Sequence, residues 1–199
     1  MKRALMVAGA VVAVFVLTVV LSAVIFPDAR KVAKDAAADV TDSNGCALTG
    51  IVVLEAQAVP SASKVPCVLD TLVGWTEGTQ QVENGSSRHT YQTTSTEGAQ
   101  WVIELHPTCN PPAEASTAPF GDKDVTRRRT DRIEGTIAIH EEWYVFAGGC
   151  AYYEVTIPER FDEQRLFREL ELSFRLIDRT AINASVERRS DGAFGLDPA

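Results

Sequence analysis

The histidines of this chain are its residues best suited to metal binding or acid–base chemistry. Glu104 and His106 are separated by one residue, and His140 is followed directly by Glu141 and Glu142. Imidazole and carboxylate groups together bind several divalent metal ions, and both can transfer protons. Glu104, His106 and His140 are therefore the candidate site of an envelope hydrolase or a metal-dependent enzyme.

A simpler interpretation is that these residues belong to a solvated sheet surface. Both His106 and His140 fall on the outward face of the strands that we expect around them. The chain has no Gly-x-Ser-x-Gly elbow, no phosphate-binding loop and no Gly-x-Gly-x-x-Gly motif. A Ser-His-Asp triad is set by geometry and leaves no spacing signature. We therefore assign no catalytic residue, no metal site and no cofactor from the sequence, and we keep the enzyme as the alternative.

A dense basic stretch at residues 126–132 is the candidate contact site. It follows the proline-rich segment 107–123, which is long enough to be a functional loop. The planar guanidinium group binds phosphate through paired hydrogen bonds, so these arginines could bind an envelope polymer, a lipid headgroup or an acidic protein. The alternative is a solvated loop whose charge is offset by nearby aspartates. The four arginines are Arg127, Arg128, Arg129 and Arg132.

Four cysteines lie beyond the N-terminal apolar run, and none forms a Cys-x-x-Cys pair. The spacings of zinc and thioredoxin-like sites are therefore absent. An even number suits two disulfides in an oxidising compartment, and four free thiols in a cytoplasmic domain are the alternative. We expect Cys46 to pair with Cys67, because a short loop closes at lower entropic cost. Cys109 then pairs with Cys150 and tethers the proline-rich loop.

Residues 4–26 carry no charge and are mostly Ala, Val, Leu, Ile and Phe. A helix of this length can cross the roughly 30 Å hydrocarbon core of a bilayer. A cleaved signal peptide would have a shorter apolar region followed by a small-x-small site, and residues 21–23 fit that pattern poorly. We expect an uncleaved transmembrane anchor. Basic residues flank it on both sides, so the cysteines rather than the positive-inside rule indicate its orientation.

The rest of the chain divides around one folded unit. We expect residues 1–3 to be a cytoplasmic stub, 27–45 a juxtamembrane spacer, 46–182 an extracytoplasmic domain and 183–199 a flexible tail. The 199 residues include 19 Lys+Arg and 27 Asp+Glu, a net charge of -8. This acidic balance disfavours nucleic acid as a partner. Arginine outnumbers lysine, and alanine and valine are abundant, which favours a bacterial source.

Strand patterns dominate the first part of the folded unit. We expect strands at residues 51–54, 88–95, 100–106 and 133–140, the last with Ile133, Ile137 and Ile139 facing inward. Residues 143–147 and 150–157 flank Gly148-Gly149 and predict a tight hairpin. In a hairpin with that loop, Phe146 pairs with Ala151 and Tyr144 with Tyr153.

A helix follows these strands. Asp162 suits an N-cap, and Leu166, Leu170, Phe174 and Ile177 recur at helical spacing. Strands followed by a helix indicate an α+β domain, an antiparallel sheet with one main amphipathic helix packed on it. We expect a single-pass cell-membrane protein whose extracytoplasmic domain is a non-catalytic interaction or assembly module of a bacterial cell envelope. Its expected partners are the membrane, through the N-terminal helix, and an envelope protein or component.

Overall fold

The computed structural model describes residues 45–69, 74–94, 98–158 and 163–198. The expected cytoplasmic stub, the membrane anchor at 4–26 and all but the last residue of the spacer lie outside these residues. Within the described part of the chain, no helix is both long and apolar enough to cross a membrane.

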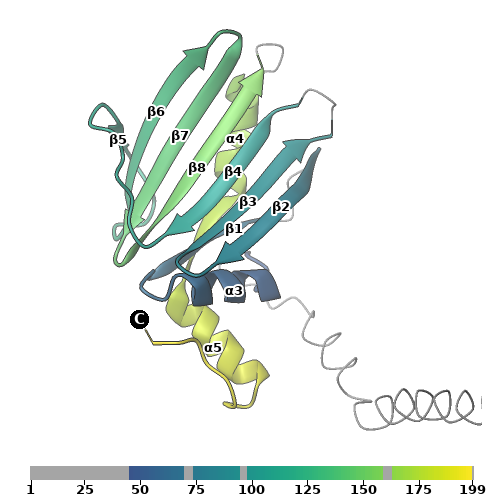
Figure 1. Cartoon of the computed structure of the whole chain (residues 1–199), viewed down its shortest axis with the longest axis vertical. Helices are drawn as coiled ribbons and strands as arrows, with labels where there is room; N and C mark the ends of the chain where they lie inside the picture. Colours follow the sequence, from purple (N-terminus) through teal and green to yellow (C-terminus); the bar gives the residue numbers. More distant parts are fainter. Residues whose placement is uncertain (1–44, 70–73, 95–97, 159–162, 199) are drawn as a thin grey trace, which may run out of the picture. The chain divides into compact units, whose positions relative to one another are not determined.

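A seven-stranded antiparallel sheet forms the body of the domain (Figure 1). Its central strands bury Trp101, Ile103 and Leu105 on one face, as the alternation of residues 100–106 predicted. These side chains and Tyr153 form the core beneath the helix that crosses this face. The strands, in spatial order, are β2 (Trp75–Glu83), β3 (Ser86–Thr93), β4 (Gln100–His106), β8 (Gly149–Pro158), β7 (Ile137–Phe146), β6 (Thr126–Glu134) and β5 (Ser116–Ala118).

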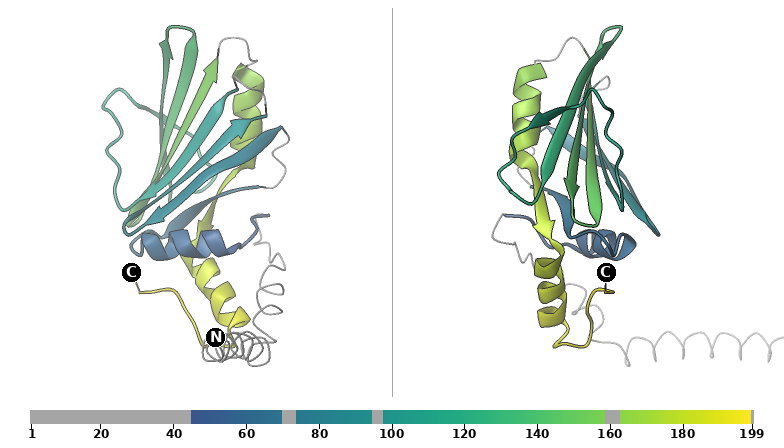
Figure 2. Two further views of the ribbon diagram at one scale, coloured as in Figure 1. Left: turned by 45° about the vertical axis from the view of Figure 1, so that its right-hand side comes forward. Right: turned by 90° about the vertical axis from the view of Figure 1, so that its left-hand side faces the viewer.

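Helix α4 (Glu163–Ser173) lies against the inner face of this sheet (Figure 2). Its side chain Leu170 is fully buried in the core. The chain continues through β9 (Phe174–Asp178), which pairs with β1 (Lys64–Val68) as a second, two-stranded sheet. Helix α3 (Gly50–Ala58) and helix α5 (Arg179–Arg189) lie at the same end of the large sheet (Figure 1). The predicted α+β class with a mostly antiparallel sheet is confirmed.

Two expected strands have a different structure. Residues 51–54 belong to helix α3. The expectation of a strand was wrong because a short apolar run fits a buried helix as well as a strand. Residues 133–140 span two strands, β6 and β7, joined by a turn at Gly135, where φ is +64°. The inward assignment of the isoleucines is therefore wrong, since Ile133 and Ile137 are exposed.

The main helix and the tail also differ from expectation. Helix α4 ends at Ser173, so Phe174 and Ile177 are buried in strand β9 rather than in a helix. The expected start of the tail at residue 183 falls inside helix α5. After that helix, the backbone N–H of Leu196 donates to the Asn183 side chain, so part of the C-terminal segment folds back on α5.

The predicted hairpin exists, but its loop begins one residue earlier than expected, so each strand partner is shifted by two residues. Strands β7 and β8 are joined at Ala147 and Gly148, so Phe146 lies opposite Gly149 and Tyr144 opposite Ala151. Gly148 has a φ of +68°, and a Cβ atom there would lie 1.9 Å from the carbonyl oxygen of Ser61. The glycine pair was therefore the correct hairpin signal, but only its first member belongs to the loop.

Candidate functional site

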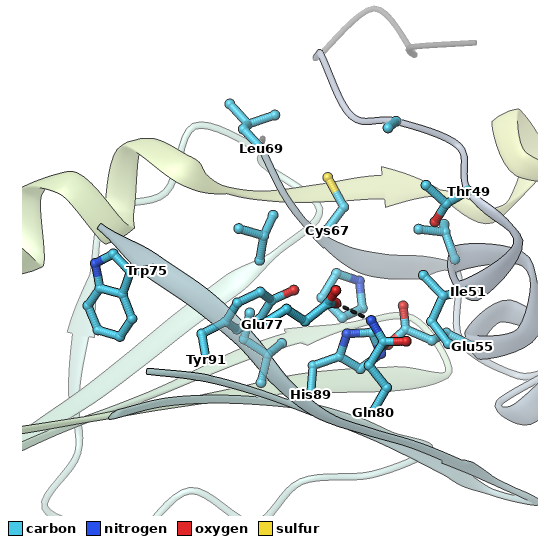
Figure 3. Close-up of a pocket in the computed structure, with 15 residues that line it drawn as sticks. Thr49, Ile51, Glu55, Cys67, Leu69, Trp75, Glu77, Gln80, His89 and Tyr91 are labelled. Atoms are coloured by element: carbon cyan, nitrogen blue, oxygen red, sulfur yellow. Dashed lines mark hydrogen bonds and ion pairs between the residues drawn. The ribbon is translucent and has the colours of Figure 1, made fainter. Parts of the chain in front are cut away.

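A cavity of about 450 Å³ lies between helix α3 and strands β1, β2 and β3 (Figure 3). Its volume falls within the range of about 300–1,000 Å³ that is usual for small-molecule sites. Apolar walls come from Ile51 and Val52 on α3 and from Leu69 after β1. Polar groups from α3, β2 and β3 converge on the same space, as expected of a ligand site. They are Glu55, Glu77, Gln80 and His89.

A bulge in β2 directs two of these polar groups into the cavity. Glu77 lies opposite Tyr91, and Gln80 lies opposite His89, so three steps along β2 match two steps along β3. In a regular strand, residues three apart point to opposite faces, but the extra residue places Glu77 and Gln80 on the same face. Gly78 permits this, because a Cβ atom there would lie 2.7 Å from Oγ1 of Thr90. The Gln80 amide donates a hydrogen bond to Glu77.

Glu55 is the buried carboxyl group of the site. It lies on α3 with 3% of its surface exposed, and Oγ of Ser87 donates a hydrogen bond of 2.7 Å to its Oε1. Burial raises the pKa of Glu55 to about 7, although the Ser87 hydrogen bond acts in the opposite direction. At neutral pH this carboxyl can therefore either donate or accept a proton.

His89 lies beside Glu55 on strand β3 and is 7% exposed. Its Nε2 is 3.2 Å from Oε1 of Glu55, yet it forms no hydrogen bond with any described group. Burial lowers the pKa of His89, while the charge of Glu77 acts to raise it. The ring is therefore neutral at pH 7, and a side chain that lines the cavity carries a buried nitrogen without a hydrogen bond to any described group.

Chemically, this arrangement suits binding better than nucleophilic catalysis. The Ser87 hydroxyl donates its hydrogen bond to Glu55 and not to His89, so the imidazole does not activate it as a nucleophile. No group of three potential metal ligands occurs among the described residues. The cavity therefore offers a ligand the proton-exchanging carboxyl of Glu55, the neutral imidazole of His89 and the aromatic side chains of Trp75 and Tyr91.

The structure does not bring Glu104, His106 and His140 together. Nε2 of His106 lies 2.8 Å from Oε2 of Glu104 on the outer face of β4. His140 lies opposite Val155 on β8, and Val155 lies opposite Trp101 on the inner face. The expected outward position of His140 is therefore wrong. The sheet separates His140 from Glu104 and His106, which lie on its outer face.

His140 instead belongs to a buried ionic network on the inner face. Its Nε2 donates to Glu142 at 2.7 Å, and its Nδ1 donates to Asp131. Burial lowers the pKa of His140, but hydrogen bonds to Glu142 and Asp131 outweigh this effect and raise it. Glu142 is fully buried and also accepts hydrogen bonds from Arg127 and Tyr144. This network fixes β6 and β7 beneath α4.

The four arginines lie in strand β6, not in a loop, and they point to both faces of the sheet. Arg127 pairs with Glu142 and with Glu171 of α4 on the inner face. Arg128 donates to the carbonyl of Ala115 at 2.8 Å on the outer face. Of the other two, Arg129 is exposed on the inner face, and Arg132 pairs with Glu134 and Glu141 on the outer face. They do not form one continuous patch.

Two disulfides join Cys46 to Cys67 and Cys109 to Cys150, the pairing expected from the sequence. The first connects the segment before α3 to strand β1, and Cys67 lines the cavity. The second attaches the proline-rich segment to β8 next to Trp143. A cross-link at the cavity wall limits the movement of α3 relative to β1.

No protein-family model matches this sequence, and no curated protein matches it. A crystal structure from Bacteroides thetaiotaomicron is similar, with 12% sequence identity and a TM-score of 0.35. The match covers 59% of this chain and 46% of the other, so this chain spans under half of that structure's length. A similarity this weak defines neither the fold nor the function.

The sequence patterns do not single out Glu55 and His89 as site residues. The alternation of residues 88–95 could have placed His89 and Tyr91 on the same face of a strand. Glu55 directly follows the apolar run 51–54, whose pattern favours a strand, and its partner Ser87 lies 32 residues away. Only the packing of α3 against β3 brings the two together.

Proposed function

We propose that this chain is a membrane-anchored, extracytoplasmic binding module of a bacterial cell envelope, and that it binds an envelope component in the cavity beside α3. The proposed activity is non-catalytic. The observation that carries the proposal is the buried Nε2 of His89, which lacks a hydrogen-bond partner among the described residues and belongs to a side chain that lines that cavity. Leaving such a group unsatisfied costs free energy that a bound ligand would recover.

Several further features support this proposal. Two disulfides fit an oxidising compartment outside the cytoplasm. The apolar segment at residues 4–26 would hold the domain at the membrane. The β2 bulge directs Glu77 and Gln80 into the cavity, and bulges often serve to aim side chains beside functional sites.

The alternative is an envelope hydrolase or metal-dependent enzyme that uses Glu104, His106 and His140. It requires these three side chains to converge on one pocket. Glu104 and His106 lie on the outer face of the sheet, whereas His140 lies on the inner face. No described feature therefore favours the enzyme.

Photo-crosslinking in living cells tests the proposal. A photoreactive amino acid at Gln80, an exposed residue at the cavity rim, should form an adduct with an envelope component. The matched control is Ile133, which is 79% exposed at the β6–β7 turn, away from the cavity lining. Adducts at Gln80 that disappear in the His89→Phe variant support the proposal. Adducts that are equal at both positions, or absent at Gln80, contradict it.

A further inference from the structure

We infer that the cavity beside α3 binds a small organic cation, a protonated amine carried on an apolar or aromatic body, an inference that rests on the proposed function. Three properties of the cavity lead to this ligand class. They are the sign of its charge, the hydrogen-bond acceptors that it offers, and the position of its aromatic side chains.

The charge of the lining is negative. Glu55 and Glu77 contribute carboxyl groups, and no Lys or Arg is among the described residues that line the cavity. Two buried basic residues of neighbouring elements have their hydrogen bonds outside the lining. Lys64 of β1 bonds Asp122 and Asp178, and Arg179 of α5 donates to the carbonyl of Ala56. An anionic ligand would lose its hydration next to two carboxyl groups, whereas an ammonium group would be attracted.

The free acceptors match the donors of an ammonium group. Burial keeps His89 neutral, so Nε2 accepts a hydrogen bond when Nδ1 carries the ring proton. Oε1 of Glu55, 3.2 Å away, accepts one hydrogen bond from Ser87 and retains a lone pair. An ammonium group carries three N–H donors and can satisfy both atoms at once.

The aromatic side chains occupy the other part of the cavity. Figure 3 shows Trp75 on one side, Glu55 and His89 on the other, and Tyr91 between them. The buried ring of Trp101 supports both aromatics, with ring centroids 6.4 Å from Trp75 and 5.2 Å from Tyr91. Aromatic faces favour cations and apolar bodies. A ligand with an amine at one end and an apolar group at the other can place the amine near Glu55 and His89 and the apolar group near Trp75.

Binding of a cation should release a proton from the site. The ammonium group stabilises ionised Glu55, whose pKa is about 7 in the empty cavity, so the carboxyl gives up its proton as the ligand enters. The groups around Glu55 are Ser87 and His89 from β3 and Glu77 from β2, with Arg179 of α5 on the neighbouring Ala56 carbonyl. None of these supplies a competing cation to the cavity.

Calorimetry with three probes of equal size tests the ligand class. The full chain in lipid nanodiscs is titrated with phenylpropylamine, phenylpropanol and phenylpropanoate, and empty nanodiscs provide the blank. We expect the amine to bind at least about tenfold more tightly than the alcohol, and the carboxylate to bind most weakly. The apparent enthalpy should vary with the ionisation enthalpy of the buffer, because protons are released.

Variants locate the interaction. Glu55→Gln should weaken amine binding about tenfold without changing alcohol binding, because it removes only the charge contribution. Glu77→Gln changes an exposed rim residue, and we expect a smaller loss. Glu83→Gln, on the same strand but outside the lining, should change nothing.

Where the probes do bind, two patterns of affinity would overturn the ligand class. One is phenylpropanoate binding as tightly as the amine, and the other is an amine preference that survives in both Glu55→Gln and Glu77→Gln. If no probe binds while the Gln80 adduct still forms in cells, the ligand class is wrong and the binding module stands. If the adduct is also absent, both proposals are wrong.

Discussion

Oγ of Ser87 on strand β3 donates a 2.7 Å hydrogen bond to Oε1 of Glu55 on helix α3. This bond joins two elements across the cavity wall and holds a carboxyl group in a position where 3% of the residue is exposed. Ionising that carboxyl is unfavourable because burial deprives it of water, and the Ser87 bond offsets only part of the cost.

The stability of the domain should therefore depend on the protonation of Glu55. The pKa is 4.5 in the unfolded chain and about 7 in the folded chain. Between these values the folded state keeps a proton that the unfolded state has lost, so the free energy of unfolding falls as pH rises. The fall amounts to about 3 kcal/mol and is complete above about pH 7. Glu55→Gln should remove this contribution, as urea denaturation from pH 4 to pH 8 would show.

The control for this experiment is Glu83→Gln, which neutralises an exposed carboxylate on β2. It should keep the pH dependence of the parent chain, including the contributions of Glu142 and His140. Equal pH profiles for Glu55→Gln and the parent would show that Glu55 is not desolvated in solution.

Arg127 should be essential for stability because its partner Glu142 is fully buried. Nε of Arg127 lies 2.9 Å from Oε2 of Glu142. Burial acts to raise the pKa of Glu142, but hydrogen bonds from His140, Arg127 and Tyr144 lower it to about 2. Arg127→Met leaves an incompletely paired buried charge and should cost about 3–5 kcal/mol at pH 7. Chemical denaturation measures this loss.

Two further observations check the role of this network. Arg129→Met, two residues along β6 at an exposed position, should change stability by less than about 0.5 kcal/mol. The cost of Arg127→Met should shrink as pH falls from about 4.5 toward 2, because Glu142 of the variant, without Arg127, then takes up a proton, whereas parent Glu142 stays ionised down to about pH 2. A cost that is the same for both arginines would contradict the proposed ion pair.

Gly148 should not tolerate alanine. Its φ is +68°, and a Cβ atom would meet the backbone carbonyl of Ser61 at 1.9 Å. Gly135 has a similar φ of +64°, with no atom within 4 Å of its Cβ position. Gly135→Ala should thus cost about 1–2 kcal/mol from backbone strain alone. Gly148→Ala should cost clearly more, because the chain around Ser61 must also move. Comparable urea midpoints for the two variants would show that this contact is absent.

Local patterns predicted the strands well where one face is buried. The alternation of Trp101, Ile103 and Leu105 identified β4 and its buried face, because side chains of a strand change sides at each residue. The same rule failed at residues 133–140, where a turn at Gly135 interrupts the pattern. Phe174 and Ile177 fit a helical spacing, yet pairing with β1 makes their segment a strand.

The candidate site was less predictable than the fold, because it depends on contacts between distant residues. Glu55 and His89 meet only when α3 packs against β3. The β2 bulge at Gly78 leaves no clear mark in the sequence, yet it places Gln80 beside Glu77. His140 appeared solvent-facing from its strand pattern, and only the register of β7 with β8 shows that it points into the core.

The cysteines allow the proposed extracytoplasmic location to be tested in intact cells. Both pairs are disulfide-bonded, and Cys46 and Cys150 are fully buried. A maleimide should not label the denatured chain until a reductant is added, and non-reducing peptide maps should give the pairs Cys46–Cys67 and Cys109–Cys150. Serine at both positions of either pair should lower the free energy of unfolding by about 2–5 kcal/mol. The loss should be about 0.6 kcal/mol larger for the second pair, because its sequence separation is 41 rather than 21. Four thiols that react without reduction, or a domain protected from protease until cells are lysed, would contradict the extracytoplasmic location.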